Sequence, residues 1–253
     1  MLRKMGTIST ALISLLLCLT LDLSAQANKT ADNTANTYHV FPQVADGYSS
    51  DGSSYQTSLY VHSAVSGNIN CTFTMYGVPA DRLGGPSQFT IASPTAGGMI
   101  LRTTSLPENP IATGYATLTC NGPVTAQVAY GFYASDNTTL GLATVFSSQS
   151  ATVAALGLDD GYRLGIAIAN DTSNAATYLI TVVDFGGNLL GSKTVSVNPK
   201  SNVASFVDLW VPSSAGSGGV VNIQSQSGRA PFSAIGLMFD GTIFTTLPAT
   251  VLQ

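Results

Sequence analysis

Charged residues are scarce in this chain of 253 residues. Only 9% are Asp, Glu, Lys or Arg, against roughly 25% in ordinary soluble domains. The surface is therefore expected to consist of Ser, Thr, Asn and Gln, which suits hydrogen bonding to sugars or to other proteins. With 9 basic and 13 acidic residues, the chain lacks the clustered positive charge that neutralises phosphates, so no nucleic acid is expected as a partner.

The residue types that carry most enzyme chemistry are also few. The chain has two histidines, His39 and His62, and a single glutamate, Glu108. It contains no nucleophile elbow, Walker loop, dinucleotide fingerprint or zinc-protease motif. Neither histidine has an evident nucleophile and carboxylate as partners, and each is predicted to be a surface or turn residue. We expect a non-enzymatic protein, with a secreted hydrolase using an Asp-based site as the enzymatic alternative.

The apolar run at the start of the chain is too short to span a membrane. Arg3 and Lys4 precede apolar residues 12–21, and Ala25-Gln26-Ala27 has the spacing of a signal-peptidase cleavage site. A spanning helix needs roughly 20 apolar residues, and no later run reaches that length. Residues 1–27 are predicted to be a signal peptide, so the mature chain is expected to have no membrane span and to be secreted or held at the cell surface.

Cysteine is almost absent, with three residues in the whole chain. Cys18 lies in the predicted signal, which leaves Cys71 and Cys120. Their spacing fits no zinc pattern, and two ligands cannot complete a tetrahedral site. An exported chain with an even number of cysteines permits a disulfide. We predict a structural role for the pair, as one bridge or as two buried thiols, with the bridge favoured.

The sequence repeats itself once over a distance typical of a small domain. Asp46-Gly47-Tyr48 returns as Asp160-Gly161-Tyr162, and residues 56–84 align with residues 163–191 without a gap. Each unit would be about 105–110 residues long. The predicted organisation is a flexible leader at 28–37, a first domain at 38–148 and a second at 149–253. A single large sandwich containing both halves is the alternative.

Alternation of apolar and polar residues indicates β-strands. In the segment from Asn70 to Tyr76, the residues Cys71, Phe73 and Met75 share one face, as expected for a strand with one side on a core. The clearest strands are predicted at 55–62, 68–76, 114–119, 124–133, 162–170, 177–185, 191–197, 219–224 and 232–239. Many short strands with Gly and Pro between them predict an all-β fold of two tandem antiparallel β-sandwich domains, Ig-like and related by internal duplication.

Aspartates in two corresponding loops could bind calcium. Asp46 and Asp51 precede one strand, and Asp159 and Asp160 precede its counterpart in the second unit. Calcium takes six to eight oxygen ligands, whereas each loop offers two carboxylates, and turn aspartates ordinarily cap the backbone. No cofactor is therefore expected, with calcium as the possibility to test.

Several segments resemble a repeated β-domain of secreted bacterial proteins. They are Phe41-Pro42-Gln43-Val44-Ala45-Asp46-Gly47, Tyr55-Gln56-Thr57-Ser58-Leu59, Gly122-Pro123-Val124, Asp208-Leu209-Trp210-Val211-Pro212 and Phe244-Thr245-Thr246-Leu247-Pro248. The second unit departs from the opening, because Ala154-Ala155-Leu156-Gly157 stands where the Phe-Pro element would be. The resemblance implies tandem sandwiches and export, and it implies no catalytic residues.

Export, duplication and an uncharged polar surface together lead to a functional hypothesis. We expect a secreted or cell-surface protein for adhesion or extracellular interaction, whose partner is an extracellular protein or glycan. A carbohydrate-binding module is the next alternative. The fold class cannot decide between them, because sandwiches host many functions.

Overall fold

The computed structural model describes residues 35–92 and 97–252. The predicted signal peptide, residues 1–27, and the predicted leader as far as residue 34 lie outside the described residues. Within them the fold is all-β, with antiparallel sheets, one short α-helix and two short 3-10 helices. No helix in these two ranges is long and apolar enough to cross a membrane.

Seven strands lie in the first half, which we define as residues 36–146, and the other nine in the second half, residues 151–251. The first half contains β1 (Asn36–Tyr48), β2 (Ser54–Ser63), β3 (Ile69–Tyr76), η1 (Ala80–Arg82), β4 (Gln88–Ile91), β5 (Gly98–Arg102), β6 (Ala112–Tyr133) and β7 (Thr139–Phe146). The second half contains β8 (Val153–Leu158), β9 (Arg163–Asn170), β10 (Ala176–Asp184), β11 (Leu189–Val197), β12 (Ser201–Phe206), α1 (Val207–Trp210), η2 (Pro212–Ser214), β13 (Gly219–Ser225), β14 (Ser233–Asp240), β15 (Ile243–Pro248) and β16 (Thr250–Val251).

The long strand β6 connects the two layers of the first half. Its residues 112–120 pair with β1 and β3, and its residues 124–133 pair with β2 and β7. The sequence predicts two strands here, and the structure corrects this to one continuous strand. Pro123, which cannot donate to a ladder, lies where β6 changes partners, so no pairing is lost. Its carbonyl accepts a hydrogen bond from the Ala64 N–H at 3.1 Å.

The strand neighbours follow the same order in the two halves. The first half has the orders β4-β3-β6-β1 and β5-β2-β6-β7, within one sheet folded over itself. The second half has two separate sheets, β11-β10-β13-β8-β16 and β12-β9-β14-β15. The strands of each half can be numbered in chain order, with residues 112–120 and 124–133 of β6 counted as two strands. Each pairing in the two first-half orders then joins the same two positions as a pairing in the second half, so that β3 corresponds to β10 and β2 to β9.

The apolar cores follow the predicted alternation. On β3, Cys71 and Phe73 are buried and Met75 packs against the same cluster from its edge. On β10, Tyr178 and Ile180 are fully buried in the core of the second half. The strand period of two is therefore confirmed at these positions.

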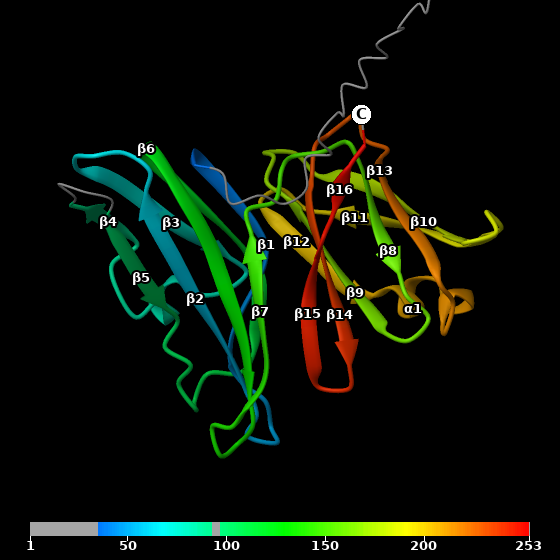
Figure 1. Ribbon diagram of the computed structural model, residues 1–253, viewed down its shortest axis with the longest axis horizontal. Coiled ribbons are helices and arrows are strands. Elements are labelled where there is room, and N and C mark those ends of the chain that lie inside the picture. Colours follow the sequence, from blue (N-terminus) through cyan, green and yellow to red (C-terminus); the bar gives the residue numbers. More distant parts are fainter. Residues whose placement is uncertain (1–34, 93–96, 253) are drawn as a thin grey trace, which may run out of the picture.

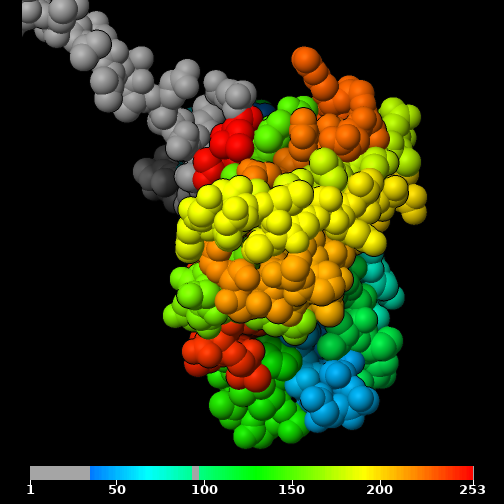
Figure 2. Space-filling model, turned by 90° about the vertical axis from the view of Figure 1, so that its right-hand side faces the viewer, coloured from blue at the N-terminus to red at the C-terminus, as the bar shows by residue number. Residues whose placement is uncertain are grey.

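The two halves lie side by side and share a packed junction (Figure 1). Ile166 and Ile168 of β9 belong to the core of the second half, whereas Ala167, between them, belongs to the core of the first. Ile235 and Leu237 of β14 also pack into the first core. The sheet β12-β9-β14-β15 is thus covered on both faces, and its central strands are apolar at consecutive positions. In the view from the side of the second half, the second half lies in front of much of the first (Figure 2).

Strand β1 begins earlier than the predicted domain boundary. It starts at Asn36, inside the range predicted as leader, because it pairs with β6 from that residue on. Residues 186–188 form the turn of the β10–β11 hairpin, with Gly187 at φ 81°.

Candidate functional site at the junction of the two halves

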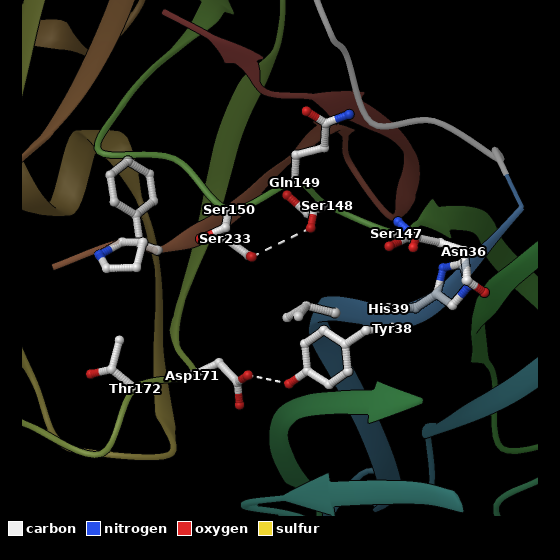
Figure 3. Close-up of a pocket in the computed structure, with 13 residues that line it drawn as sticks. Asn36, Tyr38, His39, Ser147, Ser148, Gln149, Ser150, Asp171, Thr172 and Ser233 are labelled. Carbon is white, nitrogen blue, oxygen red and sulfur yellow. Dashed lines mark hydrogen bonds between the residues drawn. The ribbon is translucent and has the colours of Figure 1, made fainter. Parts of the chain in front are cut away.

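The loop after β9 places a carboxylate between the halves. β9 ends at Asn170, a buried amide whose Nδ2 donates to the backbone oxygens of Asn174 and Val197 at 2.8 and 3.1 Å. Its Oδ1 accepts from the N–H of Thr172 at 3.1 Å. These bonds fix the loop, so that the side chain of the intervening Asp171 points toward the first half (Figure 3).

The Asp171 carboxylate accepts hydrogen bonds from both halves. Its Oδ2 accepts from the Tyr38 hydroxyl on β1. Its Oδ1 accepts from the Tyr115 hydroxyl on β6 at 2.8 Å and from Lys200 Nζ at 2.9 Å. The Lys200 Nζ also lies 5.9 Å from the ring of Tyr76, which stacks on Tyr115 with centroids 4.6 Å apart. We call these five residues the Asp171 cluster.

Both tyrosines bonded to Asp171 act as donors. Burial raises the pKa of Tyr38 and of Tyr115 far above the ordinary value, and the hydrogen bond to the Asp171 carboxylate raises it further. A phenol that stays protonated can only donate to a carboxylate. Charge-assisted bonds of this kind are stronger than neutral ones, so the cluster joins the halves at a defined position.

A polar cavity of about 440 Å³ lies beside the Asp171 cluster. Figure 3 shows that its walls come from the start of β1, from the segment linking β7 to β8, from the loop after β9 and from the start of β14. The lining residues are Asn36, Tyr38, His39, Val40, Ser147, Ser148, Gln149, Ser150, Asp171, Thr172, Pro231, Phe232 and Ser233.

The wall of this cavity is held by buried hydroxyl groups. Ser148 Oγ donates to the backbone oxygen of Ala234 at 2.8 Å, and the Ser148 N–H donates to that of Val40 at 2.8 Å. Ser233 Oγ in turn donates to the Ser148 oxygen at 3.4 Å. The linking segment is thus anchored to both halves, and the cavity keeps its shape. Hydroxyls, amides and one lysine-paired carboxylate suit a neutral ligand that hydrogen-bonds.

The two histidines lie in different environments. His39 is buried, with Nε2 3.2 Å from the backbone oxygen of Asn36 and 3.0 Å from that of Val124. The prediction of a surface or turn residue is therefore wrong for His39, because pairing of β1 with β6 covers it. His62 is exposed near the end of β2, as predicted.

The aspartates considered for calcium have other roles. Asp46 is fully buried, 3.8 Å from the guanidinium of Arg82, and its Oδ1 accepts from the Ser105 N–H at 2.9 Å. Asp51 accepts from the N–H and hydroxyl of Ser53, and these bonds lower the pKa of Asp51.

In the loop of the second half, Asp159 accepts a hydrogen bond from the Gly161 N–H, and Asp160 is exposed. Among residues 35–92 and 97–252, no group of three or more His, Cys, Asp or Glu side chains is placed to hold a metal ion. Calcium binding stays a hypothesis for which these loops offer no assembled ligand set.

Cys71 and Cys120 face each other across the β3–β6 ladder and form a disulfide, with Cα atoms 4.1 Å apart. Both are buried in the core of the first half. The place corresponding to Cys71 in the second half belongs to Tyr178, whose ring packs edge-on against Phe232 at 5.1 Å. Tyr178 is fully buried in the core of the second half.

Sequence reasoning did not single out the Asp171 cluster. Nothing in the local sequence distinguishes Asp171 from other aspartates, because its hydrogen-bond partners Tyr38 and Tyr115 lie 133 and 56 residues away. The one local signal is the polar run from Asn170 to Asn174 directly after an apolar strand. Comparison with known proteins gives no match to a family model, a curated protein or a solved structure.

Proposed function

We propose that this protein is an exported, non-enzymatic interaction module, secreted or retained at the cell surface, that binds an extracellular partner. Export is supported by the signal-like residues 1–27 and by the Cys71–Cys120 disulfide, a bond that persists in oxidising compartments. We further propose that the halves are Ig-like sandwiches that arose by duplication. The support is the repeated Asp-Gly-Tyr element, the ungapped alignment and the matching order of strand neighbours.

The observation that carries the interaction function is the exposed apolar tip of the β10–β11 hairpin. Phe185 is 81% exposed and Leu189 is 65% exposed, in a protein with well-packed cores. Exposed apolar side chains grouped at one place mark interaction sites more often than isolated ones do. In Figure 1 this hairpin, in yellow, extends from the second half away from the first.

The hairpin tip is held in a fixed shape. The Asp184 carboxylate accepts from the Asn188 N–H at 2.8 Å and from its side-chain amide at 2.9 Å. The Phe185 ring lies against Gly218, where a Cβ would come within 2.5 Å of the ring. A turn that is ordered before binding loses little backbone entropy when its side chains contact a partner.

Binding of the purified mature protein to intact cells of its source tests this function. Burying one such side chain contributes about 1.5–3 kcal/mol, so the double variant Phe185→Ser, Leu189→Ser should bind at least about tenfold more weakly. Leu142→Ser removes a side chain that is 59% exposed on β7 and serves as the control. Equal binding by the double variant and the wild type would refute the assignment to this hairpin.

Carbohydrate binding is the second candidate, favoured by the neutral hydroxyl and amide lining of the junction cavity. Retention on insoluble polysaccharides and a glycan array test it. The discriminating variant is Ser150→Ala, which removes one lining hydroxyl at an exposed position. If the cavity binds glycan, this variant loses retention and the Phe185→Ser, Leu189→Ser variant keeps it. The reverse result, or no retention of the wild type, excludes the cavity.

A further inference from the structure

A second concavity at the junction differs in chemistry from the polar cavity. It is a groove of about 320 Å³, and its lining residues are mainly apolar: Gln43, Tyr130, Gly165, Ile166, Ala167, Ala204, Ser205, Phe206, Leu209, Leu237 and Phe239. Binding sites for small molecules have volumes of about 300–1,000 Å³, apolar and aromatic walls and a few placed polar groups. This groove meets each condition.

Small residues of β9 and β12 leave the groove open. Gly165 lies beneath the aromatic wall, and a Cβ there would come within 3.3 Å of Phe239 and 3.7 Å of Phe206. These two rings meet edge to face with centroids 5.2 Å apart. Leu209 of α1 extends the groove and is 66% exposed. The apolar walls are thus partly in contact with water. A ligand that covered them would bind more tightly, because apolar surface would be removed from water.

The first half contributes hydrogen-bonding groups to the groove. Gln43 of β1 is buried, and its Oε1 accepts a hydrogen bond from Asn202 Nδ2 at 3.4 Å. Tyr130 of β6 lines the groove together with Gln43. A side-chain amide and a phenol offer both donors and acceptors to a ligand group. A ligand here would contact both halves at once.

The charges nearest the groove compensate each other. Arg163 lies over the Phe206 ring, 3.7 Å from its centroid, and its Nε is 2.8 Å from the carboxylate of Asp208. Each of these two charges therefore already has a partner of opposite sign. Desolvating an unpaired charge is costly, so the groove discriminates against anions and cations alike.

The geometry points to a binding site for a small uncharged molecule, largely aromatic or alicyclic, with one hydrogen-bonding group directed at Gln43 and Tyr130. This site goes beyond the proposed interaction function and does not depend on it, because the β10–β11 hairpin shares no residue with the groove.

Two dyes with the same ring skeleton test the site on the mature protein. N-phenyl-1-naphthylamine is uncharged, and 8-anilino-1-naphthalenesulfonate carries one negative charge. The uncharged dye is expected to bind saturably at one site per chain and to receive excitation energy from Trp210, the sole tryptophan of the chain and the neighbour of Leu209. The sulfonate should bind at least about tenfold more weakly. Absence of saturable binding by the uncharged dye, or equal affinity for both, overturns the proposal.

Substitutions then locate the dye. Ala204→Phe places a ring in the groove from an exposed position of β12 and should abolish binding. Leu209→Ser removes an exposed wall and should weaken binding several-fold without disturbing a core. Thr194→Phe, at an exposed position of β11, adds the same ring on a strand that contributes no residue to the groove, and it should leave binding unchanged. Wild-type affinity in both groove variants, or an equal loss in Thr194→Phe, would place the dye elsewhere.

Discussion

Replacing Asp171 by alanine removes the shared acceptor of the junction. Tyr115 is fully buried, so its hydroxyl would lose its acceptor, which costs about 1–3 kcal/mol. Tyr38 and the Lys200 side chain are 42% and 44% exposed, so water can replace the hydrogen bonds that they lose. Their loss should lower the free energy of unfolding by about 1 kcal/mol or less. The free energy of unfolding should therefore fall by about 2–3 kcal/mol.

Urea unfolding of the mature protein measures this loss, followed by far-ultraviolet circular dichroism and by Trp210 fluorescence. Asp171→Asn keeps an acceptor oxygen and the shape of the side chain, so it should cost about 1 kcal/mol. Asp240→Ala removes an exposed carboxylate at the end of β14 and should cost less than about 0.5 kcal/mol. If Asp171→Ala were no more destabilising than Asp240→Ala, the cluster would not hold the halves together.

Three further predictions concern stability. Thiol titration of the folded protein should find no free thiol at Cys71 or Cys120, and reduction should destabilise it by about 4 kcal/mol, as expected for a bridge closing 49 residues. Gly114→Ala should cost about 3 kcal/mol or prevent folding, because its Cβ would lie 1.8 Å from a backbone oxygen, whereas Gly157→Ala, with open space around it, should be neutral in a melting experiment. Burial raises the pKa of Tyr178 to about 12, so its contribution to stability should fall between about pH 10, where the unfolded phenol ionises, and about pH 12. Tyr178→Phe should make the fall of stability with pH less steep, and the part that remains comes from the other tyrosines with a raised pKa, such as Tyr38 and Tyr115.

Local patterns predicted the strands well where one face is polar. The alternation of Cys71, Phe73 and Met75 identified β3 and its buried face, because period two is a property of the strand itself. Residues 36–48 were not predicted as a strand, since β1 is buried along most of its length and lacks alternation. Its assignment depends on pairing with β6, more than sixty residues later in the sequence.

The junction could not be read from local sequence. The Asp171 cluster and the apolar groove each combine side chains of both halves, and the relative position of the halves follows from packing over the whole sheet β12-β9-β14-β15. The sequence predicted a strand at residues 232–239, where β14 lies, but it gave no sign that both faces of this strand are buried. The sequence pattern also could not identify the exposed tip at Phe185, because an apolar residue has the same place in the pattern whether it is buried or exposed.

Photo-crosslinking from position 185 on intact cells tests the central claim most directly. A photoreactive phenylalanine analogue there should form a discrete crosslinked product with an extracellular macromolecule, while the same analogue at position 142 should not. Retention of that product in the Ser150→Ala background would show that it does not depend on the junction cavity. An absence of any product specific to position 185 would contradict the account of this protein as an interaction module that binds through the β10–β11 hairpin.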